Sequence, residues 1–145
     1  MKKLSFILIA IFLCFNVTYA HEEWTGYHVE DILFELSSYS GKEVHAVGYL
    51  MLNKNIEWKE AIIYDRSLDD NKLIRAKVLL QDTKFKTIYK YCEKVMQTEY
   101  NGKSHDDYMP CGFGMFHLNM RNSSNMDNYI NHIIFKLSDG SPKYF

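Results

Sequence analysis

The sequence predicts a mainly β fold with five strands and two helices, and three observations lead to this prediction. Short stretches rich in β-branched and aromatic residues recur along the chain and are separated by polar turns. One longer segment, between the third and fourth of these stretches, has the apolar spacing of an amphipathic helix. No repeat and no Pro/Gly/Ser-rich linker interrupts the roughly 125 residues that follow the N-terminal segment, which predicts a single domain.

The N-terminal segment has the composition of a secretory signal peptide. Two lysines precede an apolar run over 4–15, and small residues ending at Ala20 supply the positions that a signal peptidase reads. The run is about a dozen residues long, shorter than the roughly 20 that cross a bilayer as a helix. We predict a signal peptide over 1–20 and a mature domain over 21–145, periplasmic or secreted, without a membrane span. The alternatives are a retained membrane anchor, a lipoprotein modified at Cys14 and a buried core helix.

The charge balance of the mature chain is mildly acidic. Loss of Lys2 and Lys3 with the signal leaves 15 basic and 18 acidic side chains, a net charge of −3. Such a chain binds polyanions poorly unless its positive charge is concentrated in one place. A basic block, KFKTIYKY, covers 84–91 and an acidic block, SLDDNK, covers 67–72, but both are short. We therefore expect a mixed, solvated surface and no nucleic-acid partner.

The first half of the mature domain is expected to hold a helix and three strands. Over 27–41, apolar residues recur at i, i+3, i+4 and i+7, which is one helix face, and a final glycine ends the segment. The segments 42–52, 57–66 and 73–81 have the composition of strands. Gly48 lies within the first strand, where a glycine often marks a bulge or a sharp bend.

The second half is expected to hold the clearest helix and two more strands. Asp82 and Thr83 offer N-cap oxygens, and apolar residues over 85–96 then follow one helix face. After a loop, strands are predicted over 109–120 and 129–137, separated by a polar loop. Five strands with a helix between the third and fourth follow the order of the OB-fold, a partly open Greek-key barrel. The opening helix is then an addition that covers one end.

Two cysteines remain after cleavage of the signal, and they are expected to form a disulfide. An exported protein meets an oxidising compartment, and Cys92 and Cys111 are the only pair left in the mature sequence. The bond would close a loop of about 20 residues and contribute on the order of 3 kcal/mol. It would pin the helix to the fourth strand; the alternative is two buried thiols that do not meet.

Three phrases of the sequence resemble a group of small exported bacterial proteins with an OB-like fold and no known function. The phrases are GKEVHAVGYL, AIIYD and CGFGMF. The matching residues are Gly41, Lys42, Val44, Val47, Gly48, Tyr49, Ala61, Ile62, Tyr64, Asp65, Gly112, Gly114 and Phe116. The resemblance implies the fold and export, and it implies no catalytic residues.

The sequence contains no recognisable catalytic motif, and the spacing of its histidines predicts no metal site. His45, His117 and His132 lie on separate predicted strands, without the histidine partner at i+2 or i+4 that a metal centre usually has. No nucleophile elbow is present. OB-folds bind flat ligands on aromatic side chains of the middle strands, so Trp58 and Tyr64 are candidates for a ligand-binding face. The alternative is that these rings fill the core of a small barrel and cover its ends.

These observations predict an exported, non-enzymatic binding protein of the cell envelope that uses no cofactor. Its expected partner is an envelope protein or a small ligand, and an immunity or inhibitor protein is a concrete version by analogy. One alternative is an envelope metal-binding protein that uses His21, N-terminal after cleavage, together with the strand histidines. Another is a small hydrolase acting on envelope polymers. The oligomeric state does not follow from the sequence.

Overall fold

The computed structural model describes residues 24–121 and 128–145. The predicted signal peptide over 1–20, His21 and most of the predicted polar loop before residue 129 lie outside these residues. The described residues form a mainly β fold, with seven strands in one mixed sheet and three α-helices. A search of these same residues for a helix with the length and hydropathy of a membrane span finds none.

The elements follow one another along the chain in an order close to the predicted one. They are β1 (Tyr27–His28), α2 (Val29–Phe34), α3 (Leu36–Tyr39), β2 (Glu43–Asn53), β3 (Glu60–Tyr64), the short 3-10 helix η1 (Asp70–Lys72), β4 (Leu73–Val78), α4 (Asp82–Glu99), β5 (Tyr108–Asn119), β6 (Tyr129–Lys136) and β7 (Pro142–Tyr144). The five longest strands and α4 correspond to the five strands and the second helix expected from the sequence.

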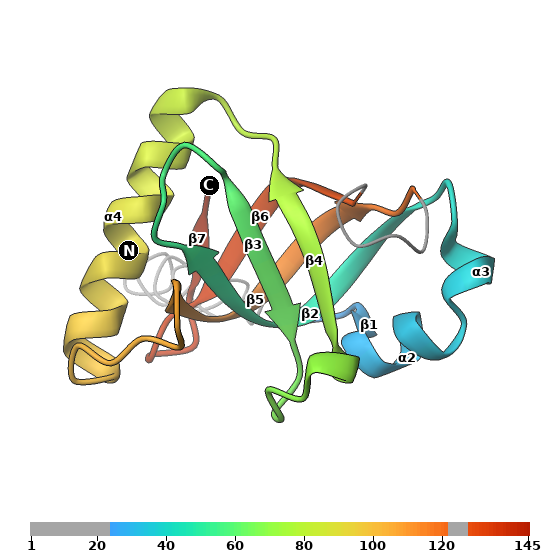
Figure 1. Cartoon of the computed structure of the whole chain (residues 1–145), viewed down its shortest axis with the longest axis horizontal. Coiled ribbons are helices and arrows are strands. Elements are labelled where there is room, and N and C mark those ends of the chain that lie inside the picture. Colours follow the sequence, from blue (N-terminus) through green and yellow to red (C-terminus); the bar gives the residue numbers. More distant parts are fainter. Residues whose placement is uncertain (1–23, 122–127) are drawn as a thin grey trace, which may run out of the picture.

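Five strands pair in a closed ring. β2 pairs antiparallel with both β3 and β5, β3 with β4, and β5 with β6. A parallel pair of β4 and β6 closes the ring, but it matches only Lys77 with Tyr129 and Val78 with Ile130. The ring is therefore not a regular barrel. In Figure 1, α4 lies at one end of it and α2 and α3 lie at the other.

The core fills the inside of the ring and is closed at its two ends by helices. Its largest side chains include Phe116 and Phe135 from neighbouring strands and Phe85 from α4, all at most 1% exposed. Val29 and Ile32 of α2 are fully buried in the same cluster. Burial of a large apolar side chain contributes about 1.5–3 kcal/mol, so both end helices are held mainly by this packing.

Cys92 and Cys111 lie at disulfide-bonding distance, as the sequence predicts. Cys92 is on the buried face of α4 and Cys111 is on β5, and both are at most 1% exposed. The bond joins the helix to the ring at the strand that α4 contacts most. A disulfide fits an oxidising, non-cytoplasmic compartment.

The opening helix and its surroundings differ from the prediction. The predicted single helix is broken at Glu35, whose φ of −115° and ψ of 37° are not helical, so α2 and α3 are separate turns. A two-residue strand, β1, precedes them and pairs parallel with β2. Gly41 follows the helical segment with φ of +74°, which agrees with the predicted stop.

Other predicted boundaries also change. β3 begins at Glu60, so Trp58 lies in the preceding turn and not on the strand. Helix α4 has Gln81 as its N-cap without a side-chain hydrogen bond, and the carboxylate of Asp82 pairs with Lys59 instead of capping the helix. The sequence analysis missed β7, which is only three residues long.

Gly48, which the sequence indicated as the site of a bulge or a sharp bend, does not lie at either of the two bulges in the ring. Gly48 is a site of close approach, because a Cβ added there would lie 2.7 Å from the carbonyl oxygen of Tyr64. The β2–β5 register shifts where Leu50 faces Gly112 and Met51 faces Pro110, so Cys111 is the extra residue of a bulge in β5. A second shift, between β5 and β6, makes Asn131 the extra residue in β6.

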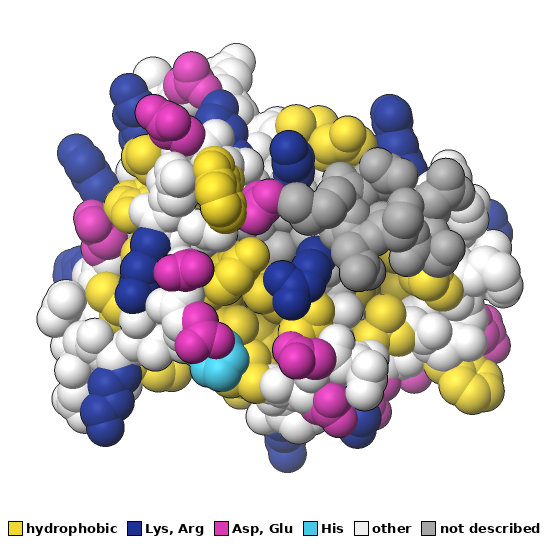
Figure 2. All heavy atoms as spheres, viewed as in Figure 1, with side chains coloured by type: hydrophobic (Ala, Val, Ile, Leu, Met, Phe, Trp, Pro, Cys, Tyr) yellow, Lys and Arg dark blue, Asp and Glu magenta, His cyan; other side chains and the backbone are white. Residues whose placement is uncertain are grey.

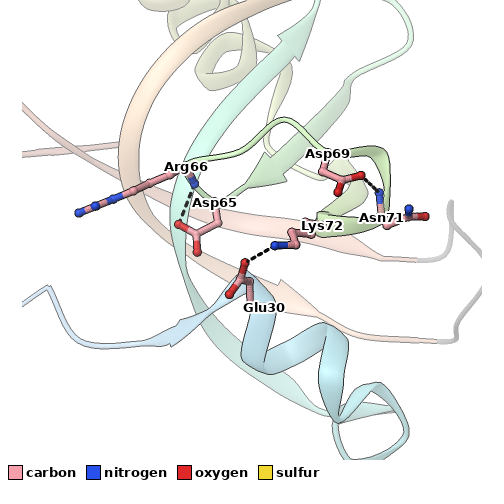
Figure 3. A network of polar contacts seen from close by, with 6 residues as sticks. All are labelled: Glu30, Asp65, Arg66, Asp69, Asn71 and Lys72. Atoms are coloured by element: carbon pink, nitrogen blue, oxygen red, sulfur yellow. Dashed lines mark hydrogen bonds and ion pairs between the residues drawn. The ribbon is translucent and has the colours of Figure 1, made fainter.

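Polar contacts on the surface reinforce the end that α2 covers. Lys72 of η1 donates to Glu30 of α2 at 3.1 Å, and Asp69 accepts a hydrogen bond from the Asn71 backbone at 3.2 Å (Figure 3). On the face shown in Figure 2, side chains of both charge signs are interspersed. This face agrees with the mixed surface expected from the sequence.

Candidate metal centre

Three histidines that are far apart in the sequence lie in one row across three neighbouring strands. His45 of β2 is the direct partner of His117 of β5, and His117 is the direct partner of His132 of β6. Glu43 lies two residues before His45 on β2, so its side chain shares the outer face of the sheet with that histidine. The four side chains therefore meet on the outside of the ring.

Two bulges place this row on one face. In β5, Met109 before the bulge and Cys111 at the bulge point into the core, whereas Phe116 and Leu118 do so after it. Side chains alternate along a strand, so one extra residue exchanges the two faces and turns His117 outward. The extra Asn131 has the same effect in β6, where Ile130 and Ile133 are both in the core and His132 is outside.

The distances within the cluster are short. The rings of His45 and His117 are stacked, with centroids 3.9 Å apart, and the His132 ring meets His117 edge-on at 4.8 Å. The Glu43 carboxylate lies 3.4 Å from Nδ1 of His117. One possible ligand atom from each of Glu43, His45 and His117 lies within 4.8 Å of the others.

The surroundings of His117 favour its neutral form. Its side chain is 26% exposed. Burial lowers the pKa of His117, and the neighbouring imidazoles of His45 and His132 lower it further, while Glu43 acts in the opposite direction. A neutral imidazole offers the lone pair that a metal ion needs, so this environment suits a ligand.

These side chains are a suitable ligand set for a transition-metal ion. Imidazole nitrogens bind Zn²⁺ and Cu²⁺ well, and a carboxylate is a common additional ligand. Bonds of about 2.0–2.2 Å in a tetrahedral site bring ligand atoms to about 3.4 Å from each other, so the three ligands must move closer by rotation of their side chains. Glu43 and His45 are exposed, which leaves them free to rotate. His132 lies against His117 in the same row but outside the three residues whose ligand atoms converge.

The structure does not bring the two predicted ligand-binding aromatics together. Trp58 is 56% exposed in the turn before β3, and Tyr64 is 8% exposed at the other end of that strand. Tyr64 packs in a small outer cluster with Met51 and Ile62 and stacks on Tyr49 at 5.5 Å. Burial raises the pKa of the Tyr64 phenol to about 12. These contacts give Tyr64 a packing role.

From the sequence, the strand histidines are ligands only in the alternative that includes His21, because no two histidines have the close spacing of a metal site on one strand or helix. Glu43 and His45 do have that spacing, at i and i+2, but one of the pair is a carboxylate. The other two ligands come from strands more than 70 residues later in the chain, and only the register of the ring joins them. His21, the terminal ligand considered from the sequence, lies outside the described residues.

Comparisons of the chain with protein-family models, with curated protein sequences and with solved structures find no match.

Proposed function

We propose that this protein is an exported metal-binding protein and that Glu43, His45 and His117 hold a divalent transition-metal ion. The observation that carries the proposal is the convergence of three possible ligand atoms within 4.8 Å on adjacent strands. A sheet is a rigid support that fixes the backbone positions of the three residues in the absence of the ion, so only their side chains need to rotate. The fourth position is open to water or to a ligand.

The ligand types favour Zn²⁺ and Cu²⁺ over Mg²⁺ and Ca²⁺. Two or three imidazoles with one carboxylate are poor ligands for the hard cations, which take oxygen ligands only. The two cysteines are joined to each other, so their sulfurs do not compete for the ion. The Irving–Williams order predicts that Cu²⁺ binds this site more tightly than Zn²⁺.

Export and the OB type of fold belong to the same proposal. The signal-like segment over 1–20 and the buried disulfide both support an oxidising compartment outside the cytoplasm. The OB-fold is supported by the position of α4 between the third and fourth strands of the ring and by the antiparallel pairing around most of it. A non-enzymatic role and an envelope-protein partner stay predictions.

Titration calorimetry with ZnCl₂ on the full chain, stripped of metal and with the disulfide intact, tests the proposal. We expect one ion to bind per chain and to stabilise the fold by about 2.7 kcal/mol when free Zn²⁺ is 100 times Kd. His117→Ala should weaken binding about 10–100-fold, because it removes the central ligand. MgCl₂ at the same concentration should give no heat.

His105→Ala is the matched control. His105 lies in the loop before β5, is 57% exposed in its side chain, and stays outside the row. This variant should bind Zn²⁺ as tightly as the unmodified chain. Equal Zn²⁺ affinity of the His117→Ala and His105→Ala variants would overturn the proposal. So would the absence of binding by the unmodified chain when the Zn²⁺ concentration is 100 times the protein concentration.

A further inference from the structure

One stripe of α4 faces a groove between this helix and the C-terminal strands. Lys84, Thr87, Lys90 and Lys94 recur at spacings of three and four residues, so they lie along one side of the helix. This stripe begins in the basic block KFKTIYKY that the sequence analysis singled out. The core-facing side of the helix carries Phe85 and other apolar residues. Figure 1 shows the chain end and β7 close to α4.

The groove consists of three hollows that share walls. The largest two, of about 490 and 580 Å³, share Thr87, Lys143 and Phe145. A third, of about 190 Å³, shares Tyr91 and Leu137 with the first of them. The hollows therefore follow one another along α4 and form one extended groove.

Positive charge is concentrated in this groove. Its walls carry the five lysines Lys84, Lys90, Lys94, Lys136 and Lys143, against the two acids Glu99 and Asp139. The whole chain, in contrast, has a net charge of −1. No ion pair between described residues engages any of the five lysines. Lys84 and Lys94 are ten residues apart on a helix, which separates them by about 15 Å.

Aromatic rings line the same walls. Tyr49, Tyr100 and Phe113 border the small hollow, and Tyr91 and Phe145 border the hollow of about 490 Å³. The Lys143 ammonium lies 5.5 Å from the Tyr91 ring and 5.6 Å from the Phe145 ring, so this charge is held in place by two cation–π contacts. Rings and lysines together suit a ligand that has flat or apolar faces and several negative charges.

From these observations we infer that the groove along α4 binds a linear anionic oligosaccharide. The extended shape fits a short polymer, the lysines fit its carboxylate or phosphate groups, and the rings fit the apolar faces of its sugars. A single-stranded nucleic acid has related chemistry, but the buried disulfide fits an oxidising compartment outside the cytoplasm, and the glycan is the polymer that agrees with export. The choice of a glycan rests on the proposed export. The groove borders the histidine row at His132 but includes none of Glu43, His45 and His117.

Fluorescence anisotropy with a labelled hexagalacturonate, in EDTA so that no metal ion contributes, tests the inference on the full oxidised chain. We expect saturable binding that weakens as salt rises. The Lys90→Glu/Lys94→Glu variant should bind at least about tenfold more weakly, a loss of about 1.4 kcal/mol. A neutral maltohexaose should not compete.

Lys86→Glu/Lys103→Glu is the matched control, since it makes the same change of charge. Lys86 is exposed on the same helix and Lys103 is exposed in the loop after it, and neither borders the groove. This variant should lose less than about twofold in affinity. Equal losses in the two variants would show that only net charge matters and would overturn the site. Tighter binding of a dT hexanucleotide than of the hexagalacturonate would overturn the glycan assignment.

Discussion

Reduction of the disulfide between Cys92 and Cys111 is expected to lower the free energy of unfolding by about 3 kcal/mol without unfolding the protein. The bond joins α4 to β5, and both cysteines are at most 1% exposed. Apolar side chains of α4, including Phe85 and Ile88, remain packed in the core when the bond is broken. The helix is therefore expected to stay in place, while the unfolded chain gains freedom.

The magnitude follows from the length of the closed loop. The sequence separation of the two cysteines is 19, so the loop contains about 20 residues. Its closure removes about 11 cal/mol/K of entropy from the unfolded chain, which corresponds to about 3.3 kcal/mol at 25 °C. A domain of this size is typically stable by about 5–15 kcal/mol, so the reduced form should remain folded.

Urea unfolding of the oxidised and the reduced protein, followed by circular dichroism, measures this difference. The free energy of unfolding falls with urea concentration at a slope of about 2 kcal/mol/M, so the urea concentration at the midpoint should fall by about 1.6 M on reduction. The reduced protein retains both sulfurs, so the comparison isolates the covalent bond. The Cys92→Ala/Cys111→Ala variant should be less stable than the reduced protein, because it also removes two buried sulfur atoms.

A midpoint that falls by less than about 0.3 M, with the slope unchanged, would refute the reasoning. It would mean that the reduced unfolded chain is already restricted to a similar degree over this loop. A change in the slope would instead show that reduction alters how much surface unfolding exposes, and the comparison of midpoints alone would no longer measure the loss.

Two further predictions concern a buried phenol and a close contact between strands. The Tyr64 pKa of about 12 exceeds the value of 10.0 for an unfolded chain, so stability from this group is present below pH 10 and is lost between pH 10 and 12. Between pH 9 and pH 11, the free energy of unfolding measured in urea should fall less in Tyr64→Phe than in the unmodified chain. An equal fall in both proteins would contradict the raised pKa. Gly114→Ala places a Cβ 2.4 Å from the Ile134 carbonyl oxygen and should cost more than about 2 kcal/mol. Gly140→Ala, with open space but φ of +84°, should cost only about 1 kcal/mol, and thermal melts that rank the two the other way would contradict this.

Most elements of the fold were predictable because each has a local cause. The content of β-branched and aromatic residues in β2, β5 and β6 indicates strands, and the helical spacing in α4 buries Phe85, Ile88 and Cys92. The break at Glu35 and the three-residue β7 have no comparable local pattern. β7 exists because β6 offers it an open edge.

The candidate metal centre was not predictable from the same patterns, because it depends on register. Alternation shows which residues of one strand share a face, but not which residue of another strand lies opposite. His117 and His132 also follow bulges, and no glycine or proline marks Asn131 as the extra residue in β6. The one local signal, Glu43 two residues before His45, was overlooked because the search was limited to histidine pairs.

The bulge at Cys111 connects the disulfide to the histidine row. Met109 and Cys111 point inward, and in a regular strand every second residue would continue to do so, which would bury His117 in an apolar core. The extra residue allows Cys111 to face Cys92 inside the ring and His117 to face His45 outside it on the same strand. Gly112, with φ of +100°, supplies the backbone conformation that makes this reversal inexpensive. The irregularity in β5 is therefore what permits one strand to stabilise the fold on one face and to present a candidate metal ligand, His117, on the other.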